Sequence, residues 1–395
     1  MKTSTPHLVR LEDVATFLGG STPSRARPQY FGGGIPWVKT TDLNNGFISQ
    51  TEESLSPLGL AESSCKMIPA KAILVAMYGG FKQIGRTGLL LQDSAINQAL
   101  TAIIPDPRKL DAAFLLEWLN FRVGYWKRFA GSSRKDPNIT KGDVADFPVP
   151  RMPVHQQIVS SRILATWNES IEKTERLIAL RIKQKAWLLA KVNSSSGRTT
   201  KFGAFLKQAS RPVPKPSEPY WALGIRSHGK GTFQRFVKDP ASVEMEELYA
   251  VSEDDLIVNI TFAWEGAIAL VKPQDERCLV SHRFPTYEID RLIADPLFVK
   301  YIVNCKEVFS QLALISPGGA GRNRVLNKKD FLKLEVSLPS LTEQKRLAQI
   351  LEGIDLLIDK ELSLLTAFKS QKRGLMQKLL TGQWRVPVAS KEVAA

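Results

Sequence analysis

The sequence predicts a mixed α+β protein, in which two globular regions are separated by two long helices that form an antiparallel coiled coil. Three observations predict this class: two segments repeat each other, both have helical periodicity, and each follows a region of mixed strand and helix character. Only two copies occur, whereas a stacked solenoid needs three or more. The chain is therefore interpreted as a duplicated half-molecule with pseudo-twofold symmetry.

The repeat is clearest around Gln157 and Gln344, which lie 187 positions apart (344 − 157). Moving the second segment back by this interval brings many identical residues into register. The residues of the first copy that recur are Gln157, Ile163, Leu164, Ile171, Lys173, Leu177, Gln184, Lys185, Leu188 and Lys191. So many identities in one frame indicate a true duplication.

Residues 155–192 and 342–381 are predicted to be long helices. Apolar residues of the second recur at alternating intervals of four and three, which is the seam of a coiled coil, broken only at Glu361 and Lys372. The same frame in the first helix is interrupted at Ser160, Thr174, Arg181 and Lys185. The predicted seam residues are Leu164, Trp167, Ile171, Ile178 and Leu188 in the first helix and Leu347, Leu351, Ile354, Ile358, Leu365, Phe368 and Leu375 in the second.

Two seams of equal length most simply pack against each other as an antiparallel pair. The alternative is that each helix is the buried edge of a separate globular domain. Pro339, Thr342 and Glu343 suit the start of the second helix, and Gly197 and Gly382 are predicted to stop the two helices.

The organisation predicted from these signals has five parts. They are a first head at 1–150, a central helix at 151–197, a second head at 198–337, a distal helix at 338–385 and a tail at 386–395. Both heads follow one order: a β-rich middle, an amphipathic helix, a basic glycine-containing loop and a strand that ends in proline. The helices share residue identity but the heads share only this order, which suggests variable recognition heads on a constant scaffold.

The charge of the chain favours a polyanionic partner. Among 395 residues, 54 Lys and Arg against 39 Asp and Glu give a net charge of +15. Nucleic acid is preferred over a membrane, because no apolar run of about 18 residues occurs and the first residues lack a signal-peptide core. The spacing of Cys65, Cys278 and Cys305 is not that of metal ligands, so no metal is expected. The three widely separated cysteines also suggest a protein of the reducing cytoplasm.

Several catalytic signatures are missing from the sequence. There is no phosphate-binding loop of the GxxxxGK[ST] type, and the glycines of FGGGIP (31–36) lack the strand-then-helix context of a nucleotide loop. No Asn-Pro-Pro-Tyr-like segment of an amino-methyltransferase occurs, and Pro105-Asp106 has no convincing Glu-x-Lys after it to complete a nuclease motif. Catalysis by this chain alone is not expected.

The remaining motifs are typical of nucleic-acid binding. Polar and cationic residues beside glycines can contact phosphates and base edges in IPWVKTTDL (35–43), MYGGFKQIGRTG (77–88) and GIRSHGKGTFQR (224–235). Paired basic loops at 132–138 and 318–324 occupy equivalent places in the two halves. The predicted DNA-binding residues are Lys39, Thr40, Thr41, Tyr78, Lys82, Arg86, Arg134, Lys135, Arg226, His228, Lys230, Asn259, Thr261, His282, Arg283, Arg322, Asn323 and Arg324. The structural alternative is that Trp37 and Trp264 are core residues and the others ordinary solvated loop residues.

The chain resembles the specificity subunits of type I restriction–modification enzymes over essentially its whole length. The resemblance rests on the two repeated helices, each after a strand that ends in proline. It also rests on GGGIPWVKTTDL, ILVAMYGGFKQIGRTG, INQALTAI and GIRSHGKGTF. Asn97 and Gln98 of INQALTAI join the predicted DNA-binding residues on this basis. One departure is the weaker seam of the first helix, which ends in SSSG where the second has LLTG.

The resemblance implies two target-recognition domains, each recognising one half of a split double-stranded DNA sequence. It also implies that the helices set the spacer and dock two methyltransferase subunits, with restriction and translocation subunits in the full enzyme. S-adenosylmethionine, ATP and Mg would then belong to those partners and no cofactor to this chain. A helix of about 38 residues rises about 57 Å, the length of about 17 base pairs.

Three rival functions remain open. One is a specificity protein of another phage-defence methylation system, and another is a coiled-coil adaptor whose basic heads bind RNA or protein. The third is a self-contained methyltransferase or nuclease, against which the missing motifs argue.

Overall fold

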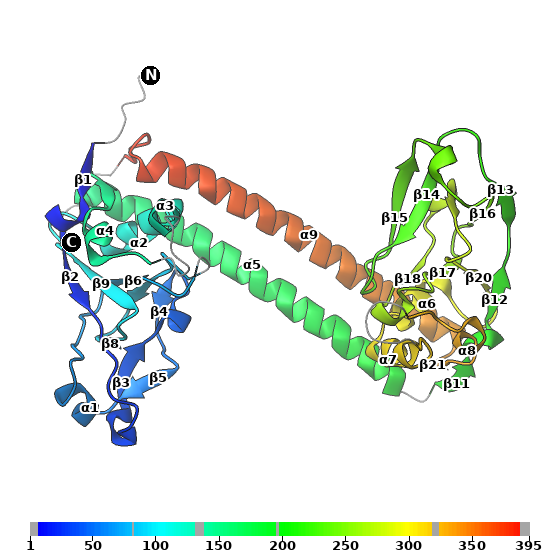
Figure 1. The fold of residues 1–395 in the computed structure, drawn as a ribbon, viewed down its shortest axis with the longest axis horizontal. Helices are drawn as coiled ribbons and strands as arrows, with labels where there is room; N and C mark the ends of the chain where they lie inside the picture. The colour runs from blue at the N-terminus through cyan, green and yellow to red at the C-terminus, as the bar shows by residue number, and fades with distance from the viewer. Residues whose placement is uncertain (1–6, 81–82, 131–137, 195–196, 318–323, 388–395) are drawn as a thin grey trace. The chain divides into compact units, whose positions relative to one another are not determined.

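The computed structural model describes residues 7–80, 83–130, 138–194, 197–317 and 324–387. The chain divides into two compact units, residues 1–175 with 364–395 and residues 176–363. Each unit contains one globular head and one half of each long helix, α5 (Val154–Ser194) and α9 (Leu341–Leu380) (Figure 1). The mixed α+β class and the two long helices predicted from the sequence are confirmed.

The head of the first unit is built on two sheets. Its strands are β1 (Leu8–Arg10), β2 (Ala15–Gly19), β3 (Phe31–Val38), β4 (Phe47–Ile48), β5 (Glu53–Leu55), β6 (Ile73–Ala76), β7 (Thr87–Leu90), β8 (Ala95–Ile96), β9 (Leu100–Pro105) and β10 (Pro148–Pro150). Its helices are α1 (Pro57–Ala61), α2 (Ala112–Phe121), α3 (Gly124–Ala130) and α4 (Lys141–Ala145). One sheet has the order β2-β9-β6-β7-β4, and the other has the order β5-β3-β8, with β3 and β8 parallel.

The head of the second unit repeats this plan. Its strands are β11 (Arg198–Lys201), β12 (Leu206–Ala209), β13 (Pro212–Pro214), β14 (Tyr220–Ile225), β15 (Thr232–Val237), β16 (Glu247–Ala250), β17 (Leu256–Val258), β18 (Ile268–Leu270), β19 (Cys278–Val280), β20 (Thr286–Ile289) and β21 (Glu335–Leu338). Its helices are α6 (Pro296–Ile302), α7 (Lys306–Leu314) and α8 (Lys328–Phe331). The sheets have the orders β12-β20-β17-β18 and β13-β16-β19-β14-β15.

The two heads share the order of several of their strands. The order β2-β9-β6-β7 of the first corresponds to β12-β20-β17-β18 of the second, and the parallel pair β3–β8 corresponds to the parallel pair β14–β19. An antiparallel ribbon joins the two ends of each head, β1 with β10 and β11 with β21. The common order of elements expected for the heads is thus present in the described residues.

Each head shares its core with the long helices. In the first unit Phe114 of α2 lies in one apolar cluster with Leu164 of α5 and Leu379 of α9. In the second, Phe298 of α6 lies in a cluster with Ala348 of α9. Both long helices are therefore part of the core of the first head, and α9 is part of the core of the second. Trp37, fully buried against Leu55, is a core residue, as the structural alternative had it.

The long helices run antiparallel. The ion pairs that establish the direction are Lys369 with Glu175 at 2.7 Å in the first unit, and Arg181 with Glu361 and Lys185 with Asp355, both at 2.6 Å, in the second. Residue numbers fall along α9 as they rise along α5. Every predicted seam residue is buried or half-buried, which agrees with the predicted coiled coil.

The two glycines after the helices act differently. Gly382 has φ +70° and its N–H donates to the Leu379 carbonyl at 3.1 Å, so it terminates α9 as predicted. A Cβ on Gly197 would lie 2.3 Å from Oγ of Ser337, so this glycine permits close approach to β21. None of the helices in the described ranges has both the length and the apolar character needed to cross a bilayer.

Candidate nucleic-acid interface

The predicted segments of the first head converge where the parallel strands β3 and β8 end. Lys39, Thr40 and Thr41 follow β3, and Asn97 and Gln98 follow β8. The Asn97 N–H donates to the Val38 carbonyl at 3.0 Å, which places the two segments side by side. Parallel strands end at the same edge of a sheet, and this edge therefore carries both predicted groups.

The glycine-bearing hairpin reaches the same edge. Residues 77–86 connect the antiparallel strands β6 and β7, and the Met77 N–H donates to the Ala99 carbonyl at 2.9 Å. The Met77 carbonyl accepts from the Ile139 N–H at 2.7 Å, so the chain that follows the basic loop returns here too. Tyr78 is exposed and Arg86 half-buried on the hairpin. The predicted residues Lys82, Arg134 and Lys135 lie outside the described residues.

Lys39 is held by carboxylates in this structure. Its Nζ lies 2.8 Å from Glu52 and 2.7 Å from Glu53, contacts that raise the pKa of the ammonium. Glu53 also accepts from Arg25 at 2.7 Å, and Arg25 stacks over the Phe31 ring at 4.5 Å. A phosphate would compete with two carboxylates for Lys39. The side chains of Thr41, Tyr78 and Gln98 are exposed at the same edge.

The second head repeats the convergence at equivalent backbone positions. The Ile260 N–H donates to the Arg283 carbonyl at 3.1 Å, and the Ile260 carbonyl accepts from the Leu326 N–H at 2.8 Å. These two bonds correspond to the Met77–Ala99 and Ile139–Met77 bonds of the first head. The segments after β17 and β19 therefore meet the residues after the second basic loop, as their counterparts do in the first head.

Side chains of the second head gather around Thr261 and Trp264. Arg283 Nη1 lies 3.5 Å from the Thr261 hydroxyl, and the Arg324 guanidinium lies 5.0 Å from the centre of the Trp264 ring. The His228 N–H donates to the Glu265 carbonyl at 2.7 Å, which brings in the turn after β14. The Thr261 N–H donates to Oδ1 of the predicted residue Asn259 at 3.1 Å. The predicted residues Arg322 and Asn323 lie outside the described residues.

The turn after β14 is shaped by residues in the left-handed region. His228 has φ +61°, Gly229 +65° and Gly231 +77°. Arg226 is fixed over the Phe233 ring at 4.9 Å, with Nη1 donating to the Thr232 carbonyl at 2.9 Å. Lys230 is exposed at the turn.

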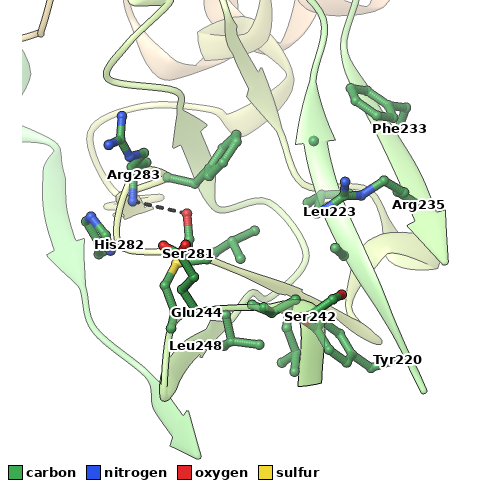
Figure 2. A pocket seen from close by; sticks show the side chains of 17 residues that line it. Tyr220, Leu223, Phe233, Arg235, Ser242, Glu244, Leu248, Ser281, His282 and Arg283 are labelled. Carbon is green, nitrogen blue, oxygen red and sulfur yellow. Dashed lines mark hydrogen bonds between the residues drawn. The ribbon is translucent and has the colours of Figure 1, made fainter. Parts of the chain in front are cut away.

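A cavity of about 600 Å³ borders this site on the face of the sheet that contains β14 and β15. Figure 2 shows His282 and Arg283 at one side of the cavity and Phe233 and Arg235 of β15 at the other. Aromatic rings and cations can stack on bases and hold phosphates. Sequence patterns did not single out Arg277, which lies just before β19 and 4.9 Å from the ring of Trp221 in β14. The two strands that bring these residues together are distant in sequence.

The family model described as "Type I restriction modification DNA specificity domain" matches residues 5–181 and 216–366. Two curated relatives are similar over shorter stretches. The HindI specificity subunit of Haemophilus influenzae is 35% identical over 97 residues, 24% of this chain and 20% of the relative. The EcoR124I/EcoR124II specificity subunit of Escherichia coli is 26% identical over 192 residues, 44% of this chain and 45% of the relative. The chain thus spans less than half the length of each.

A solved structure extends the likeness of the fold to the whole chain. The S subunit of a type I restriction–modification system from M. genitalium superposes with a TM-score of 0.60. The match covers 99% of this chain and 98% of that one, at 13% identity. At this identity the likeness concerns the fold alone.

Proposed function

The chain belongs to the type I restriction–modification DNA specificity family, and from this premise we propose that it is the sequence-recognition subunit of a type I restriction–modification enzyme. It binds double-stranded DNA in the cytoplasm. The heads at 1–150 and 198–337 are its two target-recognition domains, and each recognises one half of a bipartite target.

One observation carries this proposal. The two heads bring their predicted DNA-binding segments together through equivalent backbone hydrogen bonds, at Met77 in the first and Ile260 in the second. The side chains around these points differ: Tyr78 and Gln98 in the first head, Arg283 and Trp264 in the second. A shared backbone arrangement that carries two different sets of side chains suits the recognition of two different half-sites, because base edges are distinguished by their donor and acceptor patterns.

The helical pair is the proposed docking surface for two methyltransferase subunits and sets the spacer between the half-sites. Within the second unit it exposes large apolar side chains that a solvated coiled coil does not need. The stripe consists of Leu177, Leu180 and Trp187 on α5 and Ile350 and Leu357 on α9. Leu177, Ile350 and Leu357 each precede a core position of the heptad, so they flank the same side of an antiparallel pair. An exposed apolar stripe of this kind marks a protein interface.

Catalysis is assigned to the partners. The methyltransferase subunits would bind S-adenosylmethionine, and ATP and Mg would serve restriction and translocation subunits. This chain is the non-catalytic part that selects the site. Its lack of a phosphate-binding loop and of a methyltransferase motif supports this division of labour.

Genome-wide adenine methylation mapping tests the proposal, with this chain co-expressed with its methyltransferase partner. A gapped, bipartite motif is expected, and replacing 1–150 by another head should change one half of it. A change in both halves would contradict the two-domain assignment. Binding of S-adenosylmethionine by the purified chain alone would instead support a self-contained enzyme.

A further inference from the structure

We propose that each head is fixed on the helical pair by a three-residue joint, and that the two joints are matched to their own heads and are not interchangeable. The first joint is Glu117, Asn168 and Lys372, and the second is Tyr301, Asp355 and Lys185. These are positioning residues, and their effect on DNA recognition rests on the proposed function.

The first joint lies within the first unit and takes one residue from each of three helices. Glu117 of α2 is buried, with 6% of its surface exposed. Asn168 of α5 donates from Nδ2 to Glu117 Oε1 at 2.6 Å, and Lys372 of α9 places its ammonium 3.2 Å from Oε2. A buried carboxylate is tolerated only when it is paired and hydrogen-bonded, and these two partners supply both.

The second joint lies within the second unit and likewise takes one residue from the head helix and one from each long helix. Tyr301 of α6 is buried, and its hydroxyl lies 3.1 Å from Asp355 of α9. Lys185 of α5 contacts Asp355 at 2.6 Å and lies 5.1 Å from the centre of the Tyr301 ring. The hydroxyl also bonds Glu352 at 2.8 Å, and Glu352 pairs with Lys300 at 2.9 Å. Two ammonium groups therefore meet two carboxylates.

The joints occupy equivalent positions of the duplicated chain. Lys185 and Lys372 are 187 apart, as are Asn168 and Asp355. Glu117 and Tyr301 each lie six residues after the aspartate that caps the head helix. The lysine is constant, but the carboxylate is on the head helix in the first copy and on the long helix in the second.

This difference in the position of the carboxylate makes the two joints incompatible. A head with tyrosine, placed on helices with asparagine, would leave the lysine without its carboxylate. A head with glutamate, placed on helices with aspartate, would bring two carboxylates to one lysine. Uncompensated charge in a partly buried site is strongly destabilising, so a head is accepted only with the matching helix residue.

The second joint also adjoins the DNA-recognition segment of its head. A Cβ on Gly229 would lie 2.5 Å from Oδ1 of Asn304, three residues after Tyr301, so the turn after β14 packs directly on this region. His228, Tyr301 and Asp355 line one cavity of about 550 Å³. A displacement of α6 at the joint would therefore be transmitted to the turn that carries His228 and Lys230.

The test transfers the first arrangement into the second joint with the full-length chain. D355N removes a carboxylate, Y301E adds one, and Y301E/D355N moves it to the head helix and restores the balance of charge. Binding is measured on a duplex with both half-sites and on one with the second half-site only, as defined by methylation mapping. D359N, at an exposed aspartate of α9, is the control.

Each single variant should lose about tenfold or more in affinity for the full target and for the second half-site alone, since the displacement of α6 reaches the turn that carries His228 and Lys230. The double variant should recover to within about threefold of the parent chain. Losses in the double variant equal to the sum of the single ones would overturn the proposal, as would single variants that match D359N.

A second measurement separates the joint from the proposed function. Hydrogen exchange of the α6 amides should accelerate in D355N and in Y301E and return toward the parent rate in the double variant. If the parent chain shows no sequence preference on DNA, the proposed function fails and the exchange pattern alone decides on the joint. Unchanged exchange in both single variants would reject the joint whatever the DNA result.

Discussion

Gln157 and Gln344 make the same three hydrogen bonds in the two copies of the repeat. Each side-chain oxygen accepts from the N–H of the aspartate that caps the head helix, at 2.8 Å for Asp111 and 2.9 Å for Asp295. Each side-chain nitrogen donates to two backbone carbonyls, one in the head and one just before the long helix. The repeat therefore preserves an amide because only an amide supplies an acceptor and two donors here.

Replacing Gln157 by alanine should lower the free energy of unfolding of the first unit by about 3 kcal/mol, because buried backbone groups lose their partners. Q344A should do the same to the second unit. Q349A, at an exposed position of α9, is the matched control and should stay within about 0.5 kcal/mol of the parent. Denaturant titration measures all three, and equal values for Q157A and Q349A would contradict this role.

Glu53 gives the first head a dependence on acid pH. Its hydrogen bonds from Arg25 and then Lys39 lower the pKa of the carboxyl from 4.5 to about 2. Folding therefore favours the ionised form, and the resulting stabilisation is complete above about pH 4.5 and is lost as the pH falls toward about 2.

The difference in stability between the parent chain and E53Q should accordingly shrink as the pH is lowered through this window. Thermal unfolding of both proteins at several pH values between about 2 and 7 measures it. A difference that stays constant across the window would show that the charge of Glu53 contributes nothing to folding.

At the scale of the elements, the period of the coiled-coil seam and the positions of its polar interruptions were predictable, but the partners of these polar residues were not. Arg181 and Glu361 break the apolar pattern of the two helices and pair with each other at 2.6 Å. Lys372 breaks it because it turns to Glu117 of the head. A helical period is a local property, whereas these partners depend on the alignment of helices far apart in sequence.

The same limit applies to the candidate site. The order of strands and helices in the heads followed from local patterns, and so did the choice of glycine-rich and basic segments. That Arg324 would stack on Trp264, or that Glu52 and Glu53 would hold Lys39, depends on which strands become neighbours. Sheet order is set by the packing of the whole head, and no local pattern contains it.

The apolar stripe makes a prediction for the helical pair. L180D and L357D should each weaken binding of the methyltransferase partner at least tenfold, because a charge in an apolar contact is desolvated without a partner. Leu180 is 52% and Leu357 39% exposed, so the fold should be little affected. K183D, also exposed on α5, controls for the added charge. Co-purification and titration measure the effect, and equal loss in K183D would argue against the stripe as the contact.

At the scale of the molecule, duplication explains which parts stay alike and which diverge. The glutamine contacts and the lysines of the joints are kept in both copies because each head must attach to the same pair of helices. The recognition side chains differ although their backbone frame is kept. Attachment is thus a constant requirement, and recognition is the part free to change.

If the helices set the spacer, lengthening them should change only the distance between the half-sites. Inserting one heptad after Glu175 in α5 and another after Ser363 in α9 keeps the seam in register, because the helices are antiparallel and these positions divide the two units. Seven residues add about 10.5 Å, or about three base pairs. Methylation mapping should then show a spacer about three base pairs longer with both half-sites unchanged. An unchanged spacer in a folded, active variant would refute the role of the helices, and altered half-sites would show that the insertion reaches the heads.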